Sequence, residues 1–336
     1  MKRRSIVLAA GFVAASMLSH VGVAFAGPET EPAPAKAPER LHDLMIGDKA
    51  PALEALEFVK GDTVTGFEKG KVYVVEFWAT WCGPCIASMP HLSELQKQYA
   101  SKGVTIIGVT SPDPRNTLPK VKDMVGAKGD DMAYTVAWDA ENKVSKSFMK
   151  AAERNGIPCS FVVDQNGYIA YIGHPMQLDE VLEGVVGGTW DLKKAAAEYV
   201  QELQAAEDFR EFDKALRREK NYAVAYARAH KVLKGPMWND ADTLNVMAWL
   251  IVDPAGSVEK KDLDIAMKAA TRANELTGGK DAGTVDTLAR VYYLKGDKAK
   301  AIELQTRAVE LAKAGKNDMM TEALQATLVE YQGAGN

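Results

Sequence analysis

The Cys-Gly-Pro-Cys segment at 82–85 constrains the fold of this chain more than any other feature. It follows an apolar, β-branched run at 72–78 and precedes a segment, 86–100, whose pattern predicts a helix. A cysteine at a strand-to-helix turn lies beside the unpaired N–H groups and the partial positive charge of a helix N-terminus. Both favour the thiolate, which is the nucleophile of disulfide exchange. Pro84 suits a first helical turn because its missing N–H costs nothing there.

The two cysteines are expected to have different roles. Cys82 is the predicted attacking thiol, since it is nearest the helix start and least expected to be buried. Cys85 is then close enough to resolve a mixed disulfide formed at Cys82. The alternative, half of a structural zinc site, needs two further ligands at similar spacing. Cys159 is the only other cysteine and the five histidines form no paired motif, so no metal is predicted.

Glu76 is the third catalytic candidate. It lies six residues before Cys82, in an apolar strand whose alternation places it on one face, under the cysteine turn. A carboxyl buried there has a raised pKa and can carry a proton to and from Cys85. The alternative is a solvated or edge-facing glutamate. We favour the functional interpretation because an unpaired buried charge without a purpose is costly.

The N-terminus has the pattern of a secretory signal peptide. Basic residues at 2–4 precede an apolar stretch at 5–23, and Ala24-Phe25-Ala26 fits a cleavage site, so residues 1–26 are predicted to be removed on export. An uncleaved anchor is disfavoured because Ser, His and small residues weaken the apolar stretch. Removal of three positive charges moves the net charge from −4 to −7. Binding of nucleic acid needs a basic surface, and nothing in this acidic composition suggests one, so no nucleic-acid partner is predicted.

Three regions follow the signal peptide. Residues 27–45 are rich in Pro, Ala and Glu and are predicted to be a linker. Residues 46–188 alternate between strand and helix signals, as in an α/β domain with a mixed sheet. The expected strands are 72–77, 104–109, 135–138, 160–163 and 168–172, and the expected helices are 84–100, 118–125, 142–152 and 178–186.

Residues 189–336 are predicted to be all-helical and repetitive. Ala, Leu, Lys and Glu dominate at helical spacing. The segment from Thr243 matches that from Thr284, and the segment from Asp262 matches that from Asp297. The earlier helix pair therefore has about six extra residues in its turn. Met319–Tyr331 is predicted to form a capping helix.

Residues 46 to about 187 resemble the thioredoxin superfamily, and more narrowly its TlpA/ResA-like (redoxin) thiol-disulfide oxidoreductases, which face the periplasm. The resemblance rests on Ile46-Gly47-Asp48-Lys49-Ala50-Pro51, on 70–82 and on Gly156-Ile157-Pro158 with the segment 161–167. It implies a thioredoxin-like α/β fold with a mixed central sheet flanked by helices. The later helical repeat resembles the tetratricopeptide repeat.

The resemblance also implies a substrate-binding surface. Pro158 is the expected cis-proline, and the backbone of Ile157 is expected to pair with an extended substrate segment. Trp81, Pro84 and Pro158 are the expected apolar contacts. Cys159 follows directly and has two interpretations, a small buried residue of a strand, which we favour because cysteine is often buried, or a third redox thiol.

The expected function is disulfide exchange with protein thiols after export to the periplasm. The thioredoxin dipeptide Gly83-Pro84 favours a reductant, which needs a membrane electron donor, and the helical repeats are expected to bind a protein partner. No cofactor is predicted. One alternative is a partner-binding scaffold with a secondary redox domain. Another is a peroxidase of the redoxin group, which is disfavoured because Thr80 is at the wrong spacing from Cys82.

Overall fold

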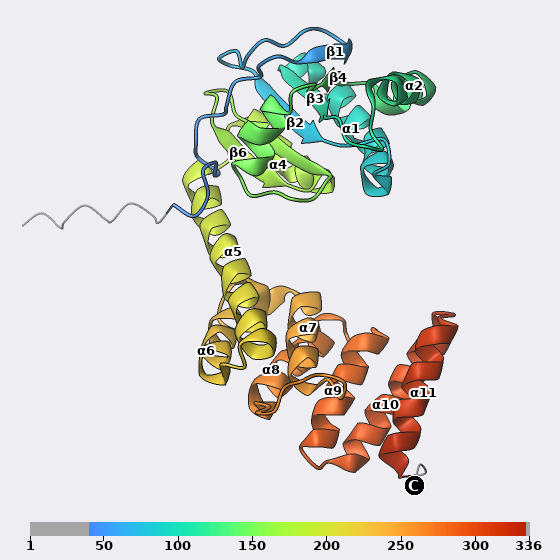
Figure 1. Ribbon diagram of the computed structural model, residues 1–336. Coiled ribbons are helices and arrows are strands. Elements are labelled where there is room, and N and C mark those ends of the chain that lie inside the picture. The colour runs from blue at the N-terminus through green and yellow to red at the C-terminus, as the bar shows by residue number, and fades with distance from the viewer. Residues whose placement is uncertain (1–39, 334–336) are drawn as a thin grey trace, which may run out of the picture. The chain divides into compact units, whose positions relative to one another are not determined.

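The computed structural model describes residues 40–333, and its first part is built on a six-stranded mixed sheet (Figure 1). The predicted signal peptide and most of the predicted linker lie outside the described residues. The strand order is β1-β4-β3-β2-β5-β6, with β2, β3 and β4 mutually parallel and the other pairings antiparallel. The strands are β1 Glu57–Lys60, β2 Val72–Phe77, β3 Val104–Thr110, β4 Thr135–Trp138, β5 Cys159–Val163 and β6 Ile169–Gly173.

Alternating residues of the strands build two separate hydrophobic clusters, one on each face of the sheet. Val74 and Trp78 of one face pack with helices α1 (Gly83–Tyr99), α2 (Leu118–Lys128) and α4 (Leu178–Gly187). The other face is covered by α3 (Lys143–Ser145), the π-helical turn after it at Lys146–Lys150, and the first half of α5 (Leu192–Asp213). The turn from β2 to α1, which carries the cysteines, thus lies at one edge of a sheet that is covered on both faces.

Most of the expected elements of this part are confirmed, but one strand was missed and one expected helix was wrong. Strands 72–77 and 135–138 agree residue for residue, while strand β1 was missed. β1 is short, lies at the sheet edge, contains an irregularity in its register and has no fully buried residue, so its sequence carries little strand signal. The helix expected at 142–152 is instead a three-residue α-helix followed by a π-helical turn.

The second part of the chain is all-helical, as expected. Helix α5 continues into a π-helical turn, Lys214–Arg218, and each helix from α7 to α11 packs against the next. The remaining helices are α6 Tyr222–Val232, α7 Ala241–Val252, α8 Leu263–Leu276, α9 Ala282–Leu294, α10 Lys298–Ala314 and α11 Asp318–Gln332.

The helix pairs reproduce the internal repeat of the sequence. Residues 253–262 separate α7 from α8, whereas only residues 295–297 separate α9 from α10. The extra residues of the earlier unit therefore lie in its turn, as predicted. Within residues 40–333, no helix is both long enough and apolar enough to cross a membrane.

Candidate active site

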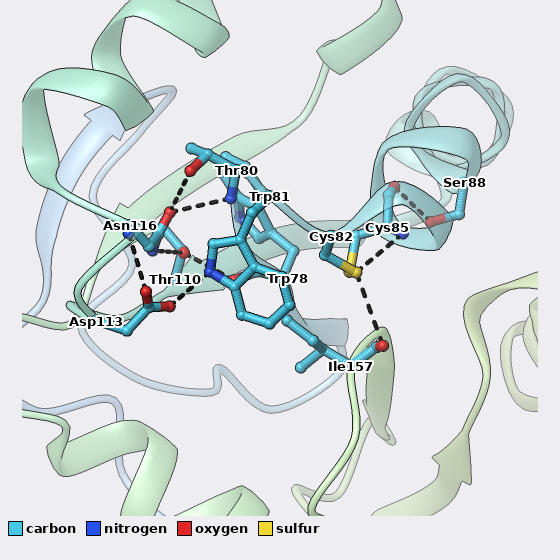
Figure 2. Close-up of a disulfide and its surroundings, with 10 residues drawn as sticks. All are labelled: Trp78, Thr80, Trp81, Cys82, Cys85, Ser88, Thr110, Asp113, Asn116 and Ile157. Carbon is cyan, nitrogen blue, oxygen red and sulfur yellow. Dashed lines mark hydrogen bonds between the residues drawn. A yellow bond between two sulfur atoms is a disulfide. The ribbon is translucent and has the colours of Figure 1, made fainter.

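Cys82 and Cys85 form a disulfide at the N-terminus of α1, with an S–S distance of 2.08 Å (Figure 2). Cys82 is the N-cap residue of the helix, and its Sγ accepts a hydrogen bond from the backbone N–H of Cys85 at 3.2 Å. The Cys82 carbonyl accepts the first helical hydrogen bond, from Ile86 at 3.0 Å. A sulfur that already accepts a helix-terminal N–H is stabilised as a thiolate when the disulfide is reduced.

Both cysteines are buried, although Cys82 is the more exposed of the two, as expected. The exposed fraction of Cys82 is 4% and that of Cys85 is 1%, so the disulfide is covered. Part of the cover comes from the Ile157–Pro158 segment, whose peptide bond is cis, as expected. The carbonyl oxygen of Ile157 lies 3.7 Å from Cys82 Sγ and faces it in Figure 2. A group that attacks Cys82 therefore has to approach beside Ile157.

Trp81 is the exposed aromatic side chain of this turn, with an exposed fraction of 41%. Its indole Nε1 donates a hydrogen bond of 2.7 Å to Asp113 Oδ2, and the guanidinium of Arg115 lies 4.0 Å from the ring centroid. Burial acts to raise the pKa of Asp113, but hydrogen bonds from the Trp81 indole and from two backbone N–H groups, together with the charge of Arg115, outweigh it, so the pKa is lowered. These contacts fix the orientation of the indole while part of its surface stays open to a ligand.

Asn116 ties the cysteine turn to the loop that follows β3. Its Oδ1 accepts hydrogen bonds from the backbone N–H and the hydroxyl of Thr80, at 3.0 and 2.9 Å. Its Nδ2 donates to Thr110 Oγ1 at 2.8 Å and to the Ser111 carbonyl at 2.7 Å. The Thr110 hydroxyl in turn donates to the carbonyl of Trp78. Because Asn116 is fully buried, this network holds the turn in one arrangement.

A cavity of about 150 Å³ opens beside this turn. A cavity of roughly this volume is large enough for a benzene-sized apolar group. Its lining is mostly apolar and comes from the end of β2, the loop after β3, the π-helical turn and the segment before Pro158. The lining includes Phe77, Trp81, Pro112, Met149 and Ile157.

Glu76 is buried as expected, with an exposed fraction of 1%. Its neighbours at alternate positions, Val74 and Trp78, belong to the same cluster as Cys82 and Cys85, which places Glu76 on the α1 face of the sheet. Burial raises the pKa of its carboxyl to about 8. Among the described residues, its Oε1 has no hydrogen-bond partner. The carboxyl therefore holds a proton near neutral pH and can release it over a range that enzymes use.

Cys159 lies on the opposite face of the sheet from Glu76. It is a free, buried thiol that pairs in register with Phe77 and packs in the cluster that contains Phe148 and Phe161. Burial raises the pKa of its thiol to about 12. A thiol in this state is a poor nucleophile. Of the two interpretations of Cys159, the structure favours the small buried residue.

The comparisons with known proteins agree with this geometry. The family model described as Redoxin matches residues 45–183. Protein FixW of Rhizobium leguminosarum is 30% identical over 151 residues, which cover 44% of this chain and 68% of FixW. A thiol-disulfide oxidoreductase ResA of Bacillus cereus is 32% identical over 141 residues, which cover 42% of this chain and 76% of ResA.

The chain belongs to the ResA-like thiol-disulfide oxidoreductases of the thioredoxin superfamily. It is accordingly an oxidoreductase with a thioredoxin-like fold. Among solved structures, a thiol:disulfide interchange protein of the thioredoxin family from Chlorobium tepidum TLS is 28% identical and matches with a TM-score of 0.36. That match covers 42% of this chain and 97% of the other.

Sequence reasoning missed part of this ResA-like site. Asp113, Arg115 and Asn116, which contact Thr80 or Trp81, all lie in the loop after β3. The sequence does contain a clue to these three residues. Parallel strands end at the same edge of a sheet, so the loops that follow them lie close together. The polar run that follows 104–110 could therefore have been assigned to the same edge as the cysteine turn.

Proposed function

We propose that this chain is an exported reductase of protein disulfides that works through Cys82 and Cys85. The observation that carries the proposal is the position of the disulfide, at the N-cap of α1 and 3.7 Å from the carbonyl of Ile157. The sulfur of Cys82 thus accepts a hydrogen bond from a helix terminus and also lies beside a backbone segment that can hold an extended client. The membership of the chain in a family of thiol-disulfide oxidoreductases supports the same chemistry.

The first step is attack by the reduced enzyme. The Cys82 thiolate attacks one sulfur of the client disulfide, a bond forms between Cys82 Sγ and that sulfur, and the client's other sulfur leaves as a thiolate that takes up a proton. The helix-terminal N–H of Cys85 stabilises the Cys82 thiolate before the attack. The product is a mixed disulfide beside Ile157.

The second step resolves this intermediate. Cys85 gives up its proton, attacks Cys82 Sγ and releases the second client sulfur, which leaves both client cysteines reduced and the Cys82–Cys85 disulfide formed. Glu76 in its ionised form, which a pKa of about 8 leaves as the minor form near neutral pH, is the proposed acceptor of the Cys85 proton. The oxidised protein is the product of this step, and its Glu76, with a pKa of about 8, holds a proton near neutral pH. That state is the one expected after the proton has moved to the carboxyl.

Client binding is assigned to the rim of the disulfide. Trp81 and Pro84 are exposed, and Ile157 and Pro158 are half-buried beside Cys82. The client segment next to its cysteine would lie along the Ile157 backbone, and one of its apolar side chains would enter the cavity of about 150 Å³ between Trp81 and Ile157. Apolar contact favours unfolded or extended protein clients over small polar disulfides.

Export and the direction of exchange belong to the same proposal. Residues 1–26 have the pattern of a signal peptide, which suggests a periplasmic site of action. A reductant outside the cytosol works against an oxidising environment. It therefore needs an electron donor, which we propose to be a membrane protein that reduces the Cys82–Cys85 disulfide after each cycle.

The helical part, from residue 189 on, is proposed to be a tetratricopeptide-like domain that binds a protein partner. The pairs α7–α8 and α9–α10, followed by the single helix α11, support this proposal because stacked helix pairs of this kind form extended binding surfaces. A scaffold role for the helical part is compatible with enzyme activity of the α/β part.

Trapping of clients tests the enzyme proposal. A Cys85→Ser variant expressed in the exporting cell should accumulate mixed disulfides at Cys82, visible as bands that disappear on reduction. The matched control is Cys82→Ser/Cys85→Ser, which should accumulate none. If Cys85→Ser forms no mixed disulfides while it is exported and folded, the proposal of disulfide exchange with protein clients is wrong.

A further inference from the structure

Helix α5 contacts the α/β part of the molecule through a stripe of four residues. Ala196, Tyr199, Val200 and Leu203 recur at the helical spacing i, i+3, i+4 and i+7. Tyr199 is buried in the cluster on the Cys159 face of the sheet, and Val200 and Leu203 pack against that cluster. Ala196 lies against Gly47, where it is 3.6 Å from the position that a Cβ would occupy. The family match ends at residue 183, so this helix lies outside it.

Tyr199 meets the segment that leads to the cis-proline. The guanidinium of Arg154 lies 5.5 Å from the centroid of the Tyr199 ring, and its Nη2 donates a hydrogen bond of 3.4 Å to the carbonyl of Ile172 in β6. The backbone N–H of Arg154 donates to the carbonyl of Met149 at 2.8 Å. Arg154 is thereby held from three sides, by β6, by the π-helical turn and by α5.

Only Asn155 and Gly156 separate Arg154 from Ile157, and both are exposed. Gly156 has no side chain to pack, and an added Cβ there would meet nothing within 4 Å. The segment that carries the Ile157 carbonyl, 3.7 Å from Cys82 Sγ, is held on one side by the anchored Arg154 and on the other by strand β5, which begins at Cys159. The side chain of Ile157 also packs against the clusters of both faces of the sheet.

We propose that α5 positions the Ile157–Pro158 segment for client binding, through the contact of Tyr199 with Arg154. The proposal rests on the proposed role of Ile157 in holding a client, and it makes Tyr199 and Arg154 positioning residues. Loss of the contact lets the segment move away from the backbone of a bound client, so an extended client binds more weakly while the chemistry at Cys82 is unchanged. Client recognition by this oxidoreductase then depends on a helix that lies beyond the residues that the family model matches.

The test compares a protein disulfide with a small one, using the full mature chain. In reduction of insulin, Tyr199→Ala and Arg154→Ala should each raise KM with little change in kcat, a loss of roughly tenfold in kcat/KM. Reduction of 5,5′-dithiobis(2-nitrobenzoate), which needs no extended backbone contact, should be unchanged. Tyr199→Phe, which keeps the ring under Arg154, should match the wild type.

Three results would overturn the positioning role. They are an unchanged KM for insulin in both alanine variants, an equal loss of kcat/KM for both substrates, or a loss of kcat/KM in Tyr199→Phe as large as in Tyr199→Ala.

A methyl NMR signal of Ile157 gives a readout that needs no activity. It should shift or broaden in Tyr199→Ala and Arg154→Ala but not in Tyr199→Phe, and an unshifted signal contradicts the proposal. A wild-type protein that reduces neither substrate would refute the proposed function instead.

Discussion

The two faces of the central sheet are built by alternate residues of the same strands, yet they differ in chemistry. On the α1 face, Glu76 of β2 and Ser160 of β5 are buried polar residues that pair directly in register. On the other face, Phe77 and Phe161 form an edge-to-face contact, with ring centroids 5.7 Å apart. One face thus carries a buried carboxyl that can exchange a proton, and the other carries aromatic packing.

The cysteines show what this difference means. Cys82 and Cys85 belong to the cluster of the α1 face, and Cys82 Sγ accepts a helix-terminal N–H. Cys159 belongs to the aromatic cluster, where burial raises the pKa of its thiol to about 12. Burial alone therefore does not make a thiol reactive or inert. The groups that surround the sulfur decide whether its thiolate is stabilised.

The largest effect is expected from the cysteines themselves. Cys82→Ser should reduce insulin-reductase activity to background, because Cys82 is the thiol at the N-cap of α1. Cys159→Ala should leave that activity unchanged, since the thiol packs among aromatic side chains on the other face. A loss of turnover in folded Cys159→Ala would show that the third thiol takes part in the reaction and would erase the distinction between the faces.

A large effect on stability is expected at Phe161. The side chain is fully buried and contacts both Phe77 and Phe148. Phe161→Ala should lower the free energy of unfolding by about 3–5 kcal/mol, the usual cost of removing a buried aromatic ring. Chemical denaturation measures this change. The reduction potential of the Cys82–Cys85 couple should stay the same, and a shifted potential in the folded variant would show that the two faces are not independent.

An intermediate effect is expected at Glu76. Glu76→Gln should slow the resolution of the mixed disulfide by roughly 10²-fold, the lower end of the effect of general acid–base groups. Rapid-mixing kinetics of the reduced protein, with both cysteines intact, separate the resolution of the mixed disulfide from the initial attack by Cys82. An unchanged resolution rate across the range from about pH 6 to about pH 9 would exclude Glu76 as the proton acceptor.

The same carboxyl makes stability depend on pH. Its pKa is raised from the ordinary 4.5 to about 8 in the fold, so between these values the native state holds a proton that the unfolded chain has released. Stability therefore falls as pH rises through this window, by at most about 1.4 kcal/mol per pH unit. The contribution is fully present below the unfolded pKa and is lost above the folded one. Urea titrations of Glu76→Gln should show a flatter pH dependence.

The smallest effect is expected at the rim. Arg115→Ala removes the guanidinium above the Trp81 ring but leaves the hydrogen bond from the indole to Asp113. An exposed cation–π contact contributes about 0.5–1 kcal/mol, so insulin KM should change by only a few-fold. Asp113→Asn, which keeps an acceptor for the indole, is the matched variant. If Arg115→Ala slowed the reaction as much as Glu76→Gln does, the residues around Trp81 would take part in the chemical step and not only in client binding.

The sequence predicted best those features that depend on neighbours along the chain. The strand 72–77 has a strong local pattern, and the cysteine turn follows directly from the residues on either side of it. The burial of Glu76 follows from strand alternation in the same segment. Where a local pattern and the fold agree, the sequence alone was sufficient.

Contacts between distant segments could not be predicted. The hydrogen bond from Trp81 to Asp113 spans 32 residues, and the contact of Arg154 with Tyr199 joins a loop to a helix beyond the family match. The break of the expected helix 142–152 into a short α-helix and a π-helical turn has the same origin. Met149 in that turn lines the cavity and accepts the backbone hydrogen bond from Arg154. Tertiary packing rather than helix propensity determines such a turn.

The central claim is that Cys82 and Cys85 form a reducing couple. The most direct test is the equilibrium reduction potential of the mature protein, measured against defined ratios of reduced and oxidised glutathione or dithiothreitol. A reversible two-electron couple near thioredoxin's value, roughly −270 mV, is the predicted result. A value near roughly −120 mV would instead identify an oxidant that makes disulfides, and the absence of a two-electron couple would contradict an enzymatic role for this site.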